Sequence, residues 1–107
     1  MSVVQVTTTC GSREEADRIA GVLVEERLAA CAQVTGPVDS RYRWKGVVER
    51  AEEWACQLKT TRRRLPALVA RIKVLHSYET PEILATSIDD GDPAYLAWVE
   101  EQVQPEP

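Results

Sequence analysis

Two runs of alternating residues on either side of Gly46 constrain the fold of this chain more than any other feature. In the first run, residues 40–45, Tyr42 and Trp44 face one way and the basic side chains between them face the other. In the second run, residues 53–60, Trp54 begins an apolar face that alternates with polar side chains. Two such runs, joined through a glycine, predict a long antiparallel hairpin.

Amphipathic helices are predicted on both sides of this hairpin. Ser12 and Glu15 have the spacing of a capping box, in which Ser12 accepts from the amide of Glu15 and Glu15 reaches back. The apolar residues that follow recur at helical spacing and predict a helix over residues 12–28. The second helix is expected to begin near Arg64, because Pro66 is tolerated only in the first turn.

Short β-rich segments complete the pattern, at residues 3–8, 29–34 and 83–88. Gly36 and Pro37 predict a turn after the second of these segments. Asp92 followed by Pro93 is a typical helix start and predicts a C-terminal helix. The order β-α-β-β-α-β is that of a ferredoxin-like α+β sandwich, here with a long hairpin and an extra helix, in a single domain over residues 1–107.

Composition excludes several classes of protein. The chain has 107 residues, of which 44% are apolar and 28% charged, which is typical of a globular protein. Its net charge of −4, from 13 basic and 17 acidic residues, argues against a nucleic-acid partner. No stretch approaches the roughly 20 apolar residues of a membrane helix, and the N-terminus lacks a secretory signal. We therefore expect a cytoplasmic protein without a membrane partner.

The three cysteines, Cys10, Cys31 and Cys56, include no CxxC pair, so a zinc knuckle is not indicated. Free thiols that behave as small apolar side chains are the expected state in a reducing compartment.

Five motifs together resemble the CutA family of divalent-cation tolerance proteins. They run in order along the chain as EERLAACAQV (25–34), YRWKG (42–46), LKTT (58–61), HSYETPEI (76–83) and GDPAYLAWV (91–99). The resemblance covers the chain from about Val3 to Trp98. It implies a ferredoxin-like subunit that forms a homotrimer through the edge strands of the hairpin, an assembly similar to that of the PII signalling proteins.

The resemblance also implies a ligand cleft between neighbouring subunits. The residues that match family motifs near that cleft are Tyr42, Trp44, Lys59, His76, Tyr78 and Glu82. The family is associated with tolerance of copper and other divalent metals, and no reaction is firmly assigned to it.

The sequence departs from the family pattern where a soft-metal site would be built. Members often read His-Pro-Tyr, whereas Leu75 and Ser77 flank His76 here. A cysteine proposed as a copper ligand in some members falls at Thr8, and Cys10 follows two residues later. These departures weaken a site made of cysteine and paired histidines, although Cys31 remains in the AAC motif.

A divalent cation is the first candidate ligand. Cu(II) or Zn(II) prefers imidazole nitrogen with thiolate or carboxylate ligands, and the candidates are His76, Glu79 and Cys31, with Glu82 as a further nearby carboxylate. One histidine per chain cannot make a strong site alone, so the ligands would come from more than one chain. The competing interpretation is that His76 caps the second helix and that its ring bonds the last carbonyls.

A small organic ligand is the second candidate. Trp44 and Tyr78 offer apolar walls, and Lys59, His76 and Glu82 offer polar groups, which is what a ligand cleft requires. Lys59 could pair an anionic ligand or simply Glu82. Tyr42 and Trp44 could instead pack between subunits, because aromatic residues are enriched at interfaces.

Catalysis is not indicated, because the sequence has no nucleophile–histidine motif, phosphate loop or GxGxxG. The sequence therefore predicts a trimeric binding protein that acts in the response to divalent metal ions. The alternative is a PII-like signalling module that binds a small anionic ligand in the intersubunit cleft.

Overall fold

A computed structural model describes residues 2–104 of the chain. One four-stranded antiparallel sheet, in the order β2-β3-β1-β4, carries the fold. In chain order the elements are β1 Val3–Cys10, α1 Arg13–Glu25, β2 Cys31–Trp44, β3 Val47–Thr61, α2 Leu65–Leu75, β4 Ile83–Ser87 and α3 Pro93–Gln102. The ferredoxin-like order predicted from the sequence is confirmed.

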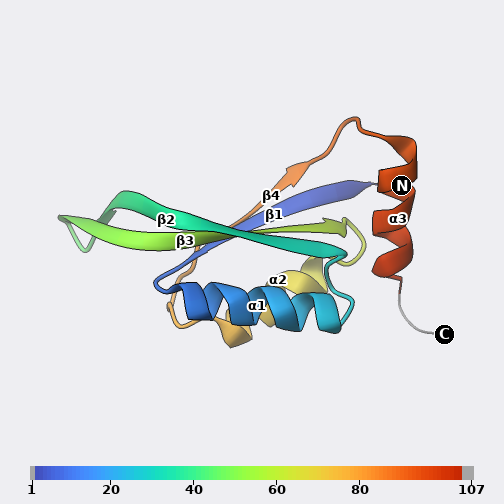
Figure 1. The fold of residues 1–107 in the computed structure, drawn as a ribbon. Coiled ribbons are helices and arrows are strands. Elements are labelled where there is room, and N and C mark those ends of the chain that lie inside the picture. The colour runs from blue at the N-terminus through green and yellow to red at the C-terminus, as the bar shows by residue number, and fades with distance from the viewer. Residues whose placement is uncertain (1, 105–107) are drawn as a thin grey trace.

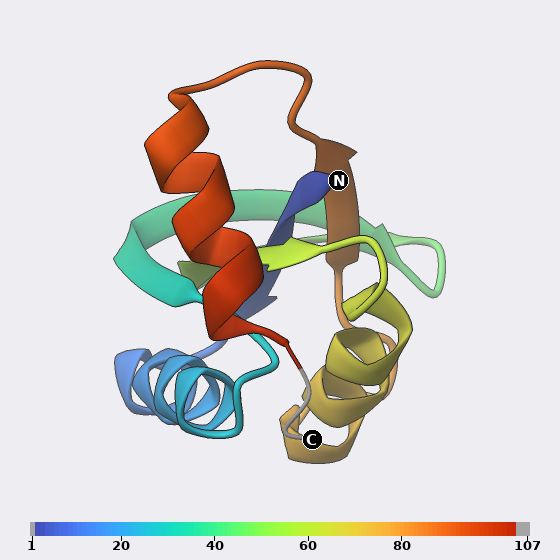
Figure 2. The same cartoon turned by 90° about the vertical axis from the view of Figure 1, so that its right-hand side faces the viewer.

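Helices α1 and α2 cover one face of the sheet, and α3 stands at one end of it (Figures 1 and 2). The main core lies between α1, α2 and the sheet. Its most buried side chains are Val4, Val6, Cys10, Ala16, Ile19, Leu23, Cys56, Leu58, Leu68 and Ile72. A smaller cluster of Val3, Ala30, Val99 and Val103 holds α3 against the end of the sheet. None of the helices within residues 2–104 is long and apolar enough to span a membrane.

The predicted hairpin is present, and its turn has the geometry that a two-residue connection favours. Tyr42 pairs with Glu49 and Trp44 with Val47, and the turn residues Lys45 and Gly46 have φ of 51° and 81°. Positive φ at both central positions matches the right-handed twist of the strands. Strand β1 pairs with β3 only as far as the Cys10–Trp54 pair, so the half of the hairpin nearest the turn extends beyond the sheet.

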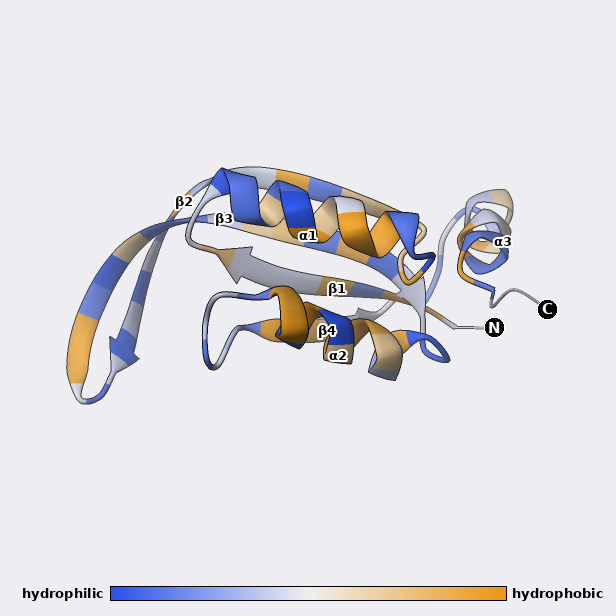
Figure 3. Ribbon diagram, turned by 90° about the horizontal axis from the view of Figure 1, so that it is seen from below, coloured by the Kyte–Doolittle hydropathy of each residue, from blue (hydrophilic) through white to orange (hydrophobic). Residues whose placement is uncertain are grey.

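The prediction of a turn at Gly36 and Pro37 is wrong. These residues lie inside the continuous strand β2, at a register shift between Thr35 and Val38, and the Gly36–Pro37 peptide bond is cis. Proline lacks an N–H and is tolerated at the bulge of an edge strand, which β2 is. Gly36 is required there, because a Cβ would lie 2.5 Å from Cδ1 of Trp54. The half of the hairpin nearest the turn curves away from the sheet (Figure 3).

Helix α1 ends earlier than its apolar pattern predicts. It stops at Glu25 because Arg27 adopts a left-handed φ of 59°, and the N–H of Leu28 turns back to the carbonyl of Leu23. Leu28 remains buried, so its place in the apolar pattern reflects packing and not helix. The predicted start of α2 is confirmed, with Arg64 as its N-cap and Pro66 in its first turn, and Asp92 caps α3 as expected.

Candidate functional site

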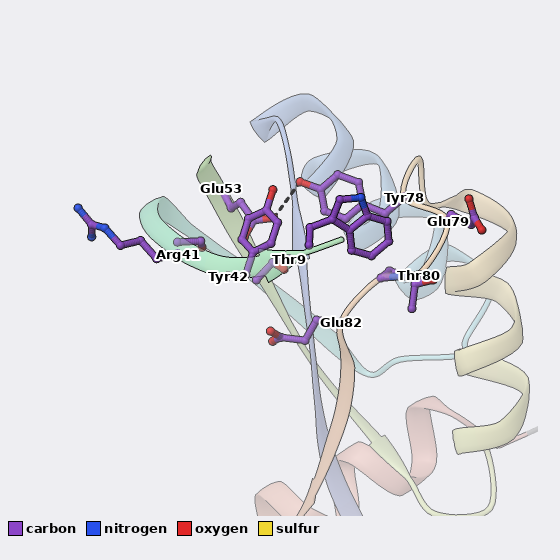
Figure 4. A pocket seen from close by; sticks show the side chains of 11 residues that line it. Thr9, Arg41, Tyr42, Glu53, Tyr78, Glu79, Thr80 and Glu82 are labelled. Carbon is purple, nitrogen blue, oxygen red and sulfur yellow. Dashed lines mark hydrogen bonds between the residues drawn. The ribbon is translucent and has the colours of Figure 1, made fainter. Parts of the chain in front are cut away.

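A cavity of about 650 Å³ opens where the extended half of the hairpin leaves the sheet (Figure 4). Strand β2, strand β3, the end of β1 and the loop after α2 all contribute to it. Its lining residues are Thr9, Ser40, Arg41, Tyr42, Trp44, Glu53, Tyr78, Glu79, Thr80, Pro81 and Glu82. The bulge at Gly36 and the curved hairpin therefore position the β2 side chains over the loop that follows α2.

Three aromatic side chains form the apolar walls of this cavity (Figure 4). Tyr42 and Trp44 alternate along β2 and are 45% and 47% exposed, and Tyr78 from the loop is 37% exposed. The predicted alternation thus places both β2 rings on the cavity side. Rings this exposed are free to contact a ligand.

Glu53 is the most buried charged group of the cavity, at 7% exposure. The Tyr78 hydroxyl donates a hydrogen bond of 2.8 Å to its Oε2. Burial and this hydrogen bond to a carboxylate raise the pKa of Tyr78 well above its usual range, so the phenol keeps its proton. Glu79 and Glu82 are exposed on the rim.

Arg41 is the basic residue of the lining, and it is directed elsewhere. Its guanidinium extends away from the rings (Figure 4) and lies 3.6 Å from Oδ2 of Asp39. The polar groups that face the cavity are therefore mainly carboxylates and hydroxyls.

His76 lies behind the cavity wall and does not line it. Its ring is held from both sides: Nε2–H donates to the carbonyl of Thr9 at 2.8 Å, and Nδ1 accepts from the backbone N–H of Tyr78 at 3.1 Å. Because the Thr9 partner only accepts and the Tyr78 partner only donates, the proton of the neutral ring lies on Nε2. Neither nitrogen has a free lone pair for a metal in this arrangement.

The helix-cap interpretation of His76 is confirmed only for its backbone. His76 is the C-cap of α2, and its N–H bonds the carbonyl of Ile72. Its ring bonds β1 and the following loop, and not the last carbonyls of the helix, because the chain turns toward the end of β1 at this residue. Cys10 Sγ lies 3.8 Å from Nε2 in the same buried space.

Glu15 completes the closed network on this side, whereas the sequence pointed to it only as a helix-capping residue. Its carboxylate accepts from the N–H of Ser77 at 2.7 Å and from the Ser77 hydroxyl at 3.0 Å. Only half of the predicted capping box forms: Ser12 accepts from the Glu15 amide, but the Glu15 side chain turns to Ser77. Ser77, a departure from the family pattern, thus supplies two donors that fix the start of the loop.

The candidate metal ligands do not meet within one chain. Cys31 lies near the other end of the sheet, in register with Lys59, and its sulfur is 3.3 Å from the Tyr95 hydroxyl. Lys59 pairs in turn with Gln5, near the start of β1, whereas His76 contacts Thr9, near the end of that strand. At about 3.3 Å per residue along β1, Cys31 is therefore roughly 15 Å from His76. Glu79 is on the cavity rim. Over residues 2–104, no group of three His, Cys, Asp or Glu side chains is placed to hold a metal ion. The residues that the structure describes in one chain therefore do not fit a Cu(II) or Zn(II) site.

The predicted ligand cleft is assembled in part. The structure brings together Tyr42, Trp44, Tyr78 and Glu82. Lys59 instead donates to Oε1 of Gln33 at 3.4 Å, on the row of Cys31, and within one chain it does not line the cavity. Sequence reasoning missed Glu53. The one feature that could have identified it is its position directly before Trp54, where the hairpin separates from β1. That position is known only once the strand register is known.

The buried thiols offer no nucleophile to the cavity. Burial raises the pKa of Cys10 to about 12 and that of Cys56 to about 11, and both side chains are fully buried. A thiol is reactive as its thiolate, so these two cysteines are inert packing groups. What the arrangement can do is hold a ligand between aromatic walls and carboxylates.

Comparison with known proteins gives a consistent result. A family model described as "CutA1 divalent ion tolerance protein" matches residues 4–102. The "Divalent-cation tolerance protein CutA" of Thermus thermophilus is 45% identical over 96 residues, which cover 90% of this chain and 93% of that protein. "Protein CutA" of Mus musculus is 38% identical over 92% of this chain but only 55% of its own length. The solved Thermus thermophilus structure superposes with a TM-score of 0.93 at 42% identity, covering 95% of this chain and 99% of that one.

Proposed function

Because the chain belongs to the CutA1 divalent ion tolerance family, we propose that it acts in divalent-cation tolerance as a homotrimeric binding protein whose ligand site is the cavity of the hairpin and the loop after α2. The observation that carries this proposal is the cavity itself, with exposed aromatic walls and a buried carboxylate. A concave site of several hundred Å³ with few polar groups is typical of small-molecule binding. Binding and not catalysis is the proposed role.

The homotrimer is supported by the parts of the fold that one chain leaves unpaired. Strand β2 is a sheet edge, and the half of β3 nearest the turn, beyond Trp54, pairs with β2 and no longer with β1. An exposed edge of this length is a template for pairing with another strand. Apolar side chains are also exposed on this half of the hairpin, including Val47 and Val48 at 58% and 60%. Association of copies through the hairpin would cover both the strand edge and these side chains, and the cavity beside it would then lie next to a neighbouring subunit.

Direct binding of Cu(II) or Zn(II) is the second candidate, supported by the divalent-cation names of the relatives. Such a site would take ligands from more than one chain, and His76 would have to give up a hydrogen bond to join it. Calorimetric titration of each metal into protein of known oligomeric state separates the two candidates. Tight, stoichiometric binding that His76→Ala removes would favour the metal site. Absent or weak binding would favour the cavity.

The experiment that tests the proposal itself is growth in elevated Cu(II) of a bacterial strain that lacks its own family member. We expect the wild-type chain to restore tolerance, and Trp44→Ala and Tyr42→Ala to lose most of it. Glu101→Gln, an exposed change on α3, is the control and is expected to behave as wild type. The oligomeric state of each variant is measured in parallel. Full tolerance with both cavity variants would contradict the proposal.

A further inference from the structure

The charge of the cavity is opposite to what an anionic ligand needs. Its lining has three carboxylates, Glu53, Glu79 and Glu82, and one guanidinium, Arg41, which is paired with Asp39 and extends outward (Figure 4). Lys59, the group that favoured an anion in the sequence, does not line it within one chain, and neither does His76. The groups that one chain contributes to the cavity therefore favour a positive charge.

We propose that the cavity binds an organic cation of the alkylammonium class, with the charged group between the rings of Tyr42 and Trp44 and the carboxylates of Glu53 and Glu82. This proposal rests on the proposed function, because it names the ligand class of the same site. The faces of tryptophan and tyrosine attract a cation through the ring quadrupole, most strongly where water is excluded.

Glu53 is the most buried carboxylate of the cavity lining. Burying a carboxylate is unfavourable unless it is hydrogen-bonded or paired. Tyr78 bonds Oε2, whereas Oε1 accepts no hydrogen bond that the structure of residues 2–104 shows and is not among their buried unpartnered atoms, so it remains open toward the cavity. A cationic ligand could pair with this oxygen, and Glu82 on the rim would add to the attraction.

The aromatic walls distinguish an organic cation from a hydrated metal ion. A divalent metal needs several oxygen ligands at about 2.0–2.6 Å, and the carboxylates within residues 2–104 do not form such a group. Rings add nothing to a hydrated ion, whereas they give a methylated ammonium both apolar contact and cation–π attraction. Three rings around one cavity therefore favour a cation that carries hydrocarbon.

Lys45 provides an internal indication of the same preference. Its Nζ lies 5.9 Å from the centre of the Trp44 ring, as a cation–π contact within the hairpin turn. A ligand cation would compete with this ammonium for the ring or be repelled by it. Removing the charge in Lys45→Met is thus expected to strengthen binding of a cation severalfold.

The test is calorimetric titration of the full chain, at measured oligomeric state, with three probes of similar size. The first is choline. The second is 3,3-dimethylbutan-1-ol, its uncharged isostere with carbon in place of nitrogen, and the third is 3,3-dimethylbutanoate, the carboxylate of the same carbon skeleton. We expect choline to bind about tenfold more tightly than the uncharged probe and the carboxylate to bind least, from one or two cation–π contacts and the carboxylates. Glu82→Gln is expected to weaken choline severalfold, whereas Glu101→Gln leaves it unchanged.

The possible failures are distinguishable. Equal binding of choline and the uncharged probe, both lost in Trp44→Ala, would overturn the cation assignment and leave the cavity as the ligand site. Preferred binding of the carboxylate would overturn it in favour of an anion. Binding of none of the probes would also overturn it. In each case the growth experiment with Trp44→Ala and Tyr42→Ala decides separately whether the cavity has the proposed function.

Discussion

His76 and Trp44 both belong to motifs that suggest a binding site, yet they differ in what they contact. Every polar atom of the His76 ring has a protein partner, and Glu15 and Ser77 extend the same network. Trp44 is nearly half exposed and lines a cavity. The loop after α2 is thus held by hydrogen bonds on the side that faces β1 and lines the cavity on the side that faces the hairpin. Residue type alone does not separate the structural role of His76 from the ligand-binding role of Trp44. The two are separated by whether the side chain's hydrogen bonds and contacts are already made within the protein.

The largest expected difference between the two regions is in stability. His76→Ala removes the hydrogen bonds of its ring to the Thr9 carbonyl and the Tyr78 amide and opens a void, so we expect a loss of about 3 kcal/mol in the free energy of unfolding. Glu82→Gln, on the exposed rim, is expected to change it by less than about 0.5 kcal/mol. Urea unfolding at one fixed chain concentration measures both. Equal effects would remove the distinction between the regions.

Glu15→Ala tests whether the network extends from His76 through Ser77. The change removes two hydrogen bonds to a carboxylate, and we expect a loss of about 2 kcal/mol. Glu14→Ala is the matched control, since Glu14 is exposed in the same first turn of α1. A comparable loss in Glu14→Ala would mean that Glu15 acts through the helix dipole alone.

Tyr78→Phe tests the boundary between the regions, and we expect a loss of about 1 kcal/mol near neutral pH. The raised pKa of Tyr78 means that above about pH 10 the unfolded chain loses this proton and the folded chain keeps it. Stability that is present below pH 10 is therefore lost as the pH rises further. In Tyr78→Phe this decline should be shallower than in wild type. Identical declines would show that Glu53 does not hold the Tyr78 proton.

Gly11→Ala should produce the smallest change. An added Cβ would lie 3.1 Å from the Tyr78 hydroxyl, so the ring must shift by a few tenths of an ångström, and we expect a loss of about 0.5 kcal/mol. Gly21→Ala, inside α1 with nothing within 4 Å of the new Cβ, should instead gain up to about 1 kcal/mol. Thermal unfolding of the pair shows whether the contact with Tyr78 or the loss of glycine dominates.

The sequence predicted the fold well because its signals are local. The alternation around Gly46, the proline near the start of α2 and the Asp92 cap each specify their own element. It failed at Gly36 and Pro37, where a bulge of an edge strand and a turn have the same residues. The contacts that distinguish them here, of Gly36 with Trp54 and the Glu53 carbonyl, come from residues distant in sequence.

The site was predicted less completely because it depends on register. The aromatic residues of the cavity were found from their motifs. The distances of Lys59 and Cys31 from His76 follow from their pairing with the start of β1, and that pairing cannot be obtained from spacing. The role of Glu15 was hidden for the same reason, since Ser77 is 62 residues away along the chain.

The most direct test of this account is a nitrogen NMR titration of the ¹⁵N-labelled chain with Zn(II) and, separately, with choline. His76 is the only histidine, so its ring signals need no separation, and Trp44→Phe identifies the Trp44 indole among three. We expect the His76 ring to keep its proton on Nε2 and to remain unchanged with Zn(II), while the Trp44 indole shifts saturably with choline. A saturable change of the His76 nitrogens with Zn(II), with Trp44 unmoved by choline, would contradict the account.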